Sequence, residues 1–453
     1  MREGHQGGER DPQPASLPSS SSPALEFRVV AQCGRARSSR MALPRHECHT
    51  PMFMPVGASL DSLVRSLAVC PEPDPFWRLN RVSITTSISI SVSTHFSGTQ
   101  GSVKGLTSRQ LQDLDCHVVL GNTYHLENRP GSELVAAMGG LHEFTAWPRG
   151  MLTDSGGFQM VSLLHLADIS EEGVTFQSPT DGHRMLLTPE HSIQVQNRLG
   201  ADIIMALDDV VPSTAADPAR FEEATHRTTR WIDRCIAAHS RPHEQNLFPI
   251  VQGGLDPRLR EVSMQGLIAR DAPGYAIGGL AGGEDKTSFI RVVSQCTAGL
   301  PMNKPKYVMG IGYPLDIILC SALGADMYDS VYPTRTARFG AALVPEGVLR
   351  VKNQECATDL RPLDPTCECM VCKRYTRAYL HPLVHRNVGF ASTLISYHNI
   401  AYTQRLTREI RASIERGTYA DYVRKAVALH YPQGDVPEWV RLALELAEID
   451  PPR

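Results

Sequence analysis

Short apolar runs alternate with helix-length segments over most of the chain. The runs are apolar at successive positions and carry Gly, Asp or Asn near their ends, which is typical of parallel strands buried on both faces. We expect strands at 51–56, 116–122, 201–209, 247–254, 274–280, 306–312 and 325–333. We expect helices between them at 188–199, 218–239, 256–270, 284–299 and 314–323. Seven or eight such units in about 300 residues predict an α/β fold of the (β/α)₈ TIM-barrel type rather than an open sheet.

The pattern divides the chain into three parts. Residues 1–25 are rich in Gly, Pro and Ser and are expected to be disordered. The barrel is expected over 26–362, interrupted at 58–98 by a segment that we interpret as an atypical, poorly packed insertion. Residues 363–453 are expected to form a zinc-binding subdomain followed by helices at 388–416, 418–430 and 436–448.

Composition limits the classes of function without choosing among them. The chain has 453 residues, of which 42% are hydrophobic and 21% charged, and it has no apolar run long enough to span a membrane. Its 11 cysteines lack framework-like spacing, so we expect a reducing compartment, the cytoplasm. The net charge of −3 does not indicate nucleic acid. A surface that binds RNA would therefore have to be locally basic.

One cysteine cluster has the spacing of a metal site. Cys367, Cys369 and Cys372 form CxCxxC, and His398 follows on an expected helix. Three thiolates and one imidazole complete a tetrahedral zinc shell with no open position, which is a structural site. His385 also follows the cluster, and the sequence leaves it open as an alternative fourth ligand.

Acidic residues stand where expected strands end. Asp154 lies in TDSGGFQ, Asp208 and Asp209 in ALDDVV, and Asp329 in MYDSVYPTR. The carboxyl ends of barrel strands carry the active sites of TIM-barrel enzymes. Two carboxylates around one reactive carbon suit glycosidic chemistry, with one as nucleophile and the other as acid or base. Glycine runs follow the same strands, but none has the GxGxxG or P-loop pattern that would indicate a nucleotide cofactor.

Seven motifs together resemble those of the tRNA-guanine transglycosylases, in particular the eukaryotic, queuine-inserting type. The resemblance extends from about Phe27 to the C-terminal helices, apart from 58–98. Its motifs are DSGGFQM, DIIMALDD, VQGGL, AIGGLAGGE, YVMGIG, MYDSVYPTRTARFG and the CxCxxC…His cluster.

The resemblance implies an exchange of the wobble guanine of GUN-anticodon tRNAs (Asp, Asn, His and Tyr) for queuine. It implies that Asp329 is the nucleophile that forms a covalent ribosyl-aspartate and that Asp154 is the general acid/base. It assigns base binding to Asp208, Gln252 and Gly279, and the lining of the base pocket to Ser155, Phe158 and Met309.

Further residues and partners come from the same resemblance. Arg335 and Arg338 would hold the anticodon loop. Val210 and Gly282 would set specificity, because glycine at 282 leaves room for the larger queuine base. A non-catalytic paralogous subunit would complete a heterodimer, located in the cytoplasm with peripheral association with the mitochondrial outer membrane.

Two other functions compete with this one. The first is a catalytically impaired, insertion-bearing variant that acts as an RNA-binding or scaffolding subunit. The second is a zinc-barrel hydrolase of free nucleosides, which gives the Arg335 and Arg338 pair no role.

Overall fold

The computed structural model of the chain describes residues 19–56, 102–157, 167–177 and 184–451. The expected insertion at 58–98 and the base-pocket candidate Phe158 lie outside these ranges. No helix within the described residues is both long enough and apolar enough to cross a membrane.

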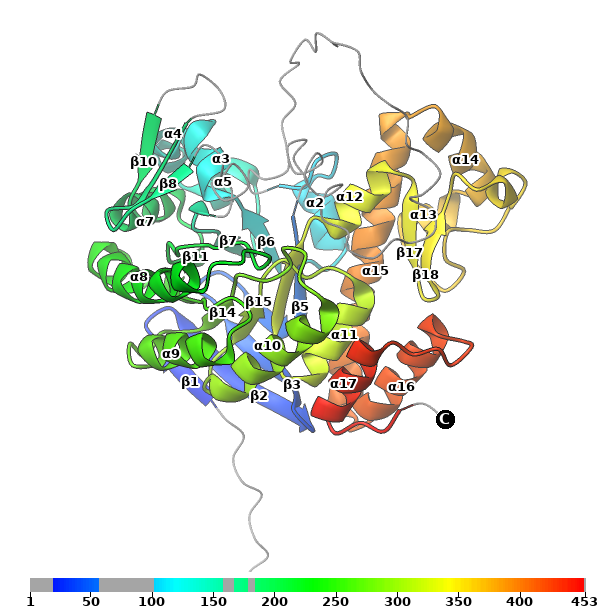
Figure 1. The fold of residues 1–453 in the computed structure, drawn as a ribbon. Helices are drawn as coiled ribbons and strands as arrows, with labels where there is room; N and C mark the ends of the chain where they lie inside the picture. Colours follow the sequence, from blue (N-terminus) through cyan, green and yellow to red (C-terminus); the bar gives the residue numbers. More distant parts are fainter. Residues whose placement is uncertain (1–18, 57–101, 158–166, 178–183, 452–453) are drawn as a thin grey trace, which may run out of the picture.

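Within the described part of the chain, eight parallel strands form a closed barrel (Figure 1). They are β5 (Met52–Pro55), β6 (Val118–Gly121), β7 (Gly150–Thr153), β11 (Ile203–Met205), β12 (Asn246–Phe248) continued by β13 (Ile250–Val251), β14 (Tyr275–Ile277), β15 (Lys306–Val308) and β16 (Met327–Ser330). β16 pairs with β5, and β5 lies beside β6, so the first and last strands meet. Pro249 separates β12 from β13, because proline has no N–H for the ladder. The predicted TIM barrel is confirmed.

Alternation along the strands separates two layers of the core. Met52, Leu152, Phe248 and Tyr307 belong to the cluster inside the barrel. Their neighbours along the strands belong to the outer cluster, between strands and helices. Side chains on a strand point alternately to opposite faces. On β16, therefore, Met327 points inward and Tyr328 points outward.

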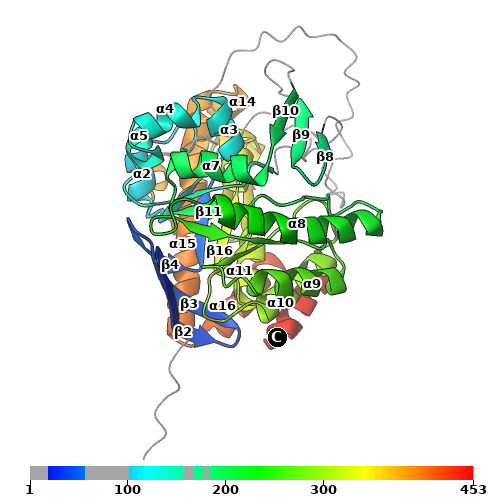
Figure 2. The ribbon, with the colours of Figure 1, turned by 90° about the vertical axis from the view of Figure 1, so that its left-hand side faces the viewer.

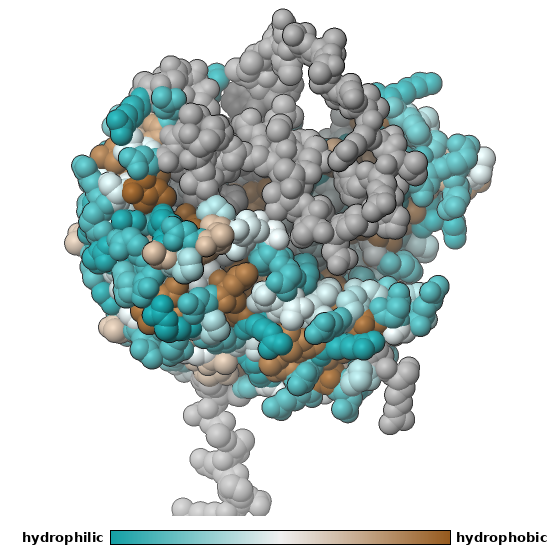
Figure 3. Space-filling view, viewed as in Figure 1, coloured by the Kyte–Doolittle hydropathy of each residue, from teal (hydrophilic) through white to brown (hydrophobic). Residues whose placement is uncertain are grey.

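Five helices cover the barrel where the sequence predicts them, with ends that differ from the predicted ones by at most two residues. They are α7 (Pro189–Leu199), α8 (Pro218–Ala238), α9 (Pro257–Ile268), α10 (Lys286–Gly299) and α11 (Pro314–Ala322). Three of them begin with a capping side chain followed by proline: Thr188, Asp217 and Asp256 accept hydrogen bonds from free N–H groups of the first turn. Hydrophilic side chains cover most of α8 and α9, with smaller apolar patches between them (Figure 3).

Two additional sheets lie at opposite ends of the barrel, and the sequence analysis predicted neither. The antiparallel sheet β1 (Ser19–Ser22), β2 (Leu25–Cys33), β3 (Ala36–Ala42) and β4 (Glu47–Thr50) lies below the barrel. The sheet β8 (Ala167–Ile169), β9 (Val174–Gln177) and β10 (Arg184–Leu187) follows β7 and lies at the other end (Figures 1 and 2).

The expectation of disorder over 1–25 is wrong for its last residues. Ser19–Ser22 pair along their full length with β2. An edge strand held by backbone hydrogen bonds needs no apolar side chains of its own, so the serine-rich composition misled the prediction.

The C-terminal region packs along one side of the barrel. It contains the hairpin β17 (Ala341–Val344) and β18 (Gly347–Arg350), the short helices α13 (Met370–Arg374) and α14 (Arg377–His385), and the long helix α15 (Gly389–Glu415). α15 contacts β5 and α12 (Tyr332–Arg338) (Figure 1). α16 (Tyr419–His430) and α17 (Glu438–Leu446) then pack against α10 and α11.

Candidate active site and metal centre

Asp329 stands at the carboxyl end of β16, two residues after the inward-pointing Met327. Its Oδ1 accepts hydrogen bonds from the Tyr307 hydroxyl at 2.6 Å and from the Gly310 N–H at 2.7 Å. Its Oδ2 accepts none from the described residues. Burial raises the pKa of the Asp329 carboxyl, and the two donated hydrogen bonds partly offset that rise.

Asp154 directly follows β7 and is held by two donors after β6 and by one in its own loop. Its Oδ1 accepts from the backbone N–H of Thr123 at 2.9 Å and of Gly156 at 3.1 Å, and its Oδ2 accepts from the Asn122 amide. The charges of Asp154 and Asp329 both raise the pKa of Tyr307, after burial, which is the main cause. Tyr307 therefore donates to Asp329, whereas Asp154 acts on this phenol only through its charge.

A third carboxylate, Asp208, lies at the same end of the barrel, where the carboxyl ends of the strands meet and which we call the mouth. It accepts from Gln252 Nε2 at 2.6 Å and from Ser155 Oγ at 3.3 Å. Burial raises the pKa of Asp208 to about 6, although these two donors lower it. At neutral pH the carboxylate is therefore mostly ionised and acts as an acceptor. The second N–H of the Gln252 amide has no acceptor among the described residues and can donate to a ligand.

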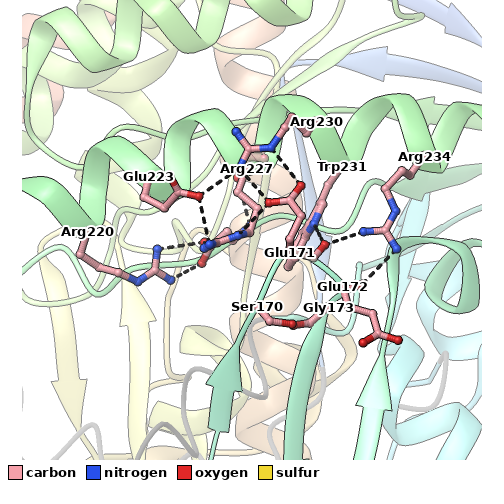
Figure 4. A network of polar contacts seen from close by, with 12 residues as sticks. Ser170, Glu171, Glu172, Gly173, Arg220, Glu223, Arg227, Arg230, Trp231 and Arg234 are labelled. Carbon is pink, nitrogen blue, oxygen red and sulfur yellow. Dashed lines mark hydrogen bonds and ion pairs between the residues drawn. The ribbon is translucent and has the colours of Figure 1, made fainter.

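Asp209 has the opposite environment from its neighbour. It is fully buried and forms ion pairs with Arg220 and with Arg227, the latter at 2.6 Å. The same arginine extends to Glu171 at the turn between β8 and β9, where Arg230 also binds (Figure 4). Arg227 thus connects Asp209 to the sheet β8–β10. Of the acidic pair, Asp208 belongs to the mouth and Asp209 does not.

The glycine run after β14 lies against the Gln252 side chain. A Cβ at Gly279 would lie 2.4 Å from Gln252 Oε1, and the residue has φ +67°. A Cβ at Gly278 would lie 3.5 Å from the sulfur of Met309. Glycine is therefore required here so that the β13 and β14 loops can approach each other, and these base-pocket candidates do converge.

The two specificity candidates lie in neighbouring loops. Gly282 is exposed, and a Cβ there would lie 2.7 Å from Ser213 Oγ. Val210, three residues before that serine, is buried. Glu284 ties the two loops together, because it accepts from the Gly282 N–H at 2.9 Å and from Ser213 Oγ at 2.7 Å.

Arg335 and Arg338 lie one turn apart on α12, directly after the nucleophile candidate. Nε and Nη2 of Arg338 are buried and have no hydrogen-bond partner among the described residues. Burial and the charge of Arg335 lower the pKa of Arg338. Two guanidinium groups that repel each other, one with unpaired donors, are suited to bind an anion.

The metal-ligand candidates meet in one cluster. The ligand atoms of Cys367, Cys369, Cys372 and His398 all lie within 4.8 Å of one another. Nε2 of His398 lies 2.8 Å from the Leu343 carbonyl, so this nitrogen donates and Nδ1 is left to face the thiols. These four residues form a metal site.

His385, the alternative ligand, lies elsewhere. Its Nε2 lies 3.0 Å from the Lys352 carbonyl, and the residue is outside the cluster. The geometry therefore favours His398 over His385 as the fourth ligand.

Sequence reasoning missed three residues that shape the mouth. Tyr307 lies on β15, two residues before Met309, which directly follows the strand, so period-two alternation would have placed it in the barrel. Asn122 follows an apolar run at the position where the aspartates follow theirs. Arg260 on α9 is fully buried and donates to the carbonyls of Val251 and Gly254, on either side of Gln252. No signal in the sequence marks this arginine.

A parallel barrel with several carboxylates gathered at its mouth defines the class of TIM-barrel enzymes that cleave or exchange glycosidic bonds. A family model described as queuine tRNA-ribosyltransferase matches residues 78–432. The catalytic subunit of queuine tRNA-ribosyltransferase from Schizosaccharomyces pombe is 45% identical over 442 residues, which cover 95% of this chain and 99% of that protein.

Two further relatives agree with this match. The catalytic subunit of queuine tRNA-ribosyltransferase from Caenorhabditis elegans is 42% identical over 437 residues, 93% of this chain and 98% of that protein. The queuine tRNA-ribosyltransferase of Thermus thermophilus is 44% identical over 421 residues, with the same coverage of 93% and 98%. The chain belongs to the queuine tRNA-ribosyltransferase family, and the predicted transglycosylase activity is confirmed.

Proposed function

We propose that this enzyme exchanges the wobble guanine of GUN-anticodon tRNAs for queuine through a covalent ribosyl ester of Asp329. The observation that carries the proposal is the environment of this carboxylate. One of its oxygens is bound by two neutral donors, the fully buried Tyr307 hydroxyl and the Gly310 N–H. A carboxylate held by hydrogen-bond donors, with no cationic partner among the described residues, is a suitable nucleophile for an anomeric carbon.

The reaction would proceed in two displacements. The guanine leaves its stack in the anticodon loop and enters the mouth, because a carboxylate cannot reach C1′ inside the loop. Asp329 forms a bond to C1′ as the bond from C1′ to N9 breaks, and Asp154 supplies the proton that the departing base needs. The incoming base then loses a proton to Asp154, its N9 attacks C1′, and Asp329 is released. The exchange consumes no ATP.

Base recognition would use the groups around Asp208. Its carboxylate accepts the N–H edge of the base, while the free N–H of Gln252 and the backbone at Gly279 bind the base carbonyl. Ser155, Met309 and Phe158, the last outside the described residues, would line the pocket. The absence of a side chain at Gly282 supports the choice of queuine over its smaller precursor.

Arg335 and Arg338 would hold the backbone of the anticodon loop. The unpaired donors of Arg338 support this role, because phosphate oxygens would complete them. This local positive charge would allow a chain of net charge −3 to bind the negatively charged RNA.

We propose zinc as the metal of the cluster of Cys367, Cys369, Cys372 and His398. Three thiolates and one imidazole are the donor set of structural zinc, and the four residues leave no ligand position open. Zinc would supply cross-linking of α13 to α15 and would take no part in the exchange.

A second subunit is proposed from the names of the relatives. The matched yeast and nematode proteins are called catalytic subunits, and this chain retains Asp329. We propose that it is the catalytic member of a heterodimer with a non-catalytic paralogue, in the cytoplasm and peripherally at the mitochondrial outer membrane. Co-purification from fractionated cells tests both statements.

Incubation with labelled guanine and a GUN-anticodon tRNA tests the central proposal. We expect incorporation of label and, after denaturing electrophoresis, an adduct between enzyme and RNA. Binding of tRNA without incorporation would instead favour the scaffolding function. Repeating the assay with residues 58–98 deleted determines whether this segment affects the rate.

A further inference from the structure

Tyr307 is a buried polar residue of the barrel interior that touches the nucleophile and has no assigned role. We propose that Tyr307 is a positioning residue: together with the Gly310 N–H it engages Oδ1 of Asp329 and so reserves Oδ2 for attack on C1′. The inference rests on the proposed role of Asp329 and deepens it.

The geometry around Oδ1 supports this assignment. Tyr307 is fully buried, and its hydroxyl lies 2.6 Å from Oδ1. The Gly310 N–H reaches the same oxygen at 2.7 Å from a turn in which this glycine has φ +80°. Two donors from one strand and its following turn fix both the position and the plane of the carboxylate. The oxygen left without a donor among the described residues is Oδ2.

Oδ1 and Oδ2 of Asp329 have different roles in each of the two displacements. When Oδ2 bonds to C1′, the pair of electrons from the broken bond to N9 leaves with the base, and Oδ1 becomes the carbonyl oxygen of the ester. When the incoming base displaces the ester, charge returns to the carboxylate, and the two donors at Oδ1 stabilise it. Tyr307 keeps its proton throughout, so atoms and charge balance without a further reactant.

A phenol suits this position better than a cation. Burial and two nearby carboxylates raise the pKa of Tyr307 well above its usual value, so the hydroxyl remains a neutral donor. An arginine in its place would pair with Asp329 and lower its reactivity, because an opposite charge stabilises the resting carboxylate. Asp326, at the other end of β16, is bound in that way by Arg37.

The test compares Tyr307→Phe with Tyr328→Phe. Tyr328 is also fully buried, but it points outward from β16 and bonds Ser321 at 2.8 Å, so its variant loses a buried hydroxyl away from the mouth. We expect Tyr307→Phe to form the adduct about 10- to 100-fold more slowly, as for loss of a hydrogen bond to a charged group, with unchanged KM for tRNA and base. Tyr328→Phe should keep the wild-type rate.

The pH profile separates positioning from a structural role. A donated hydrogen bond lowers the pKa of a carboxyl, so its removal should shift the acid limb of the rate profile of Tyr307→Phe upward by about one pH unit. Tyr328→Phe should show the wild-type profile, even if it unfolds at a lower temperature. A wild-type rate and profile for Tyr307→Phe, or equal effects of both variants, would overturn the inference.

Asp329→Ala distinguishes the inference about Tyr307 from the proposed role of Asp329 as nucleophile. If this variant still forms the adduct, Asp329 is not the nucleophile and both proposals fall. If it forms none while Tyr307→Phe behaves as wild type, only the role of Tyr307 is lost. Binding of tRNA by each variant, measured by fluorescence anisotropy, confirms that the proteins compared are folded.

Discussion

The two ends of strand β16 carry aspartates in opposite environments. Asp326, at the amino end, is fully buried and paired with Arg37, whose Nε lies 2.9 Å from its Oδ1, and it also accepts from the Lys306 N–H at 2.7 Å. Asp329, at the carboxyl end, receives from the described residues only a phenol O–H and a backbone N–H. A buried carboxylate saturated by a cation stabilises the fold, whereas one held by neutral donors retains its capacity to react.

Strand β11 repeats the contrast. Asp202, before the strand, accepts from His142 at 3.0 Å and from the Met151 N–H at 2.7 Å. Asp208, after it, is held by an amide and a hydroxyl. At the bottom of the barrel, therefore, the aspartates pair with charged or ring donors of the protein. At the mouth they are bound by neutral donors and can also accept from a ligand. This difference identifies the functional end without reference to any relative.

The largest effect should come from the mouth. Asp329→Asn removes the proposed nucleophile but preserves the shape, so exchange of labelled guanine should fall about a thousandfold or more. The melting temperature should stay the same or rise, since a neutral amide replaces a carboxylate whose pKa is raised by desolvation and which has no cationic partner among the described residues. A variant that unfolds more easily would contradict the contrast between the two ends of β16.

Loss of the metal should affect stability and not the chemistry. Cys369→Ser should lower the content of the proposed zinc, measured by atomic absorption, and destabilise the C-terminal region by several kcal/mol. The exchange rate per folded molecule should remain close to that of the wild type. A rate that falls in proportion to the metal content, in protein shown to be folded, would place the metal in the reaction.

At the bottom of the barrel, Asp326→Asn should have the opposite effects to Asp329→Asn: it should lower stability and leave exchange activity nearly unchanged. Breaking a buried ion pair leaves Arg37 without its partner, so the free energy of unfolding should fall by about 3–5 kcal/mol. Urea denaturation measures this loss. Exchange activity below the unfolding transition should be nearly unchanged. A stable but inactive variant would be evidence against a structural role for Asp326 and a reactive role for Asp329.

A smaller effect should appear in the pH dependence of base binding. Burial raises the pKa of Asp208 to about 6, so the accepting carboxylate is lost as the pH falls through that value. Base affinity should then decrease about tenfold for each further pH unit. Asp208→Asn should abolish this dependence. The stability cost of the charged group has the opposite sign: it is present above about pH 6 and disappears below the unfolded value.

The smallest effect concerns base choice within the mouth. Gly282→Val should weaken the use of queuine relative to guanine by about tenfold, the usual worth of a small steric change in a pocket. Because a Cβ at 282 would lie 2.7 Å from Ser213 Oγ, the same substitution in a Ser213→Ala background separates this collision from a collision with the base. Equal losses for both bases would remove Gly282 from specificity.

Local chemistry determined much of this protein in advance. Apolar runs and proline-capped helices located the barrel elements to within two residues for α7 to α11. The short spacing of Cys367, Cys369 and Cys372 identified three metal ligands. These features depend on neighbours along the chain, so the sequence displays them directly.

Only the tertiary structure decided which side chains meet. The choice of Asp208 over Asp209 depends on α8, which supplies arginines to one and not to the other. The choice of His398 over His385 depends on where α15 crosses the cysteine turn. Tyr307 meets Asp329 because the parallel pairing of β15 with β16 places Tyr307 beside Met327, two residues before Asp329. Such contacts join residues far apart in the chain, and no local pattern encodes the distance between them.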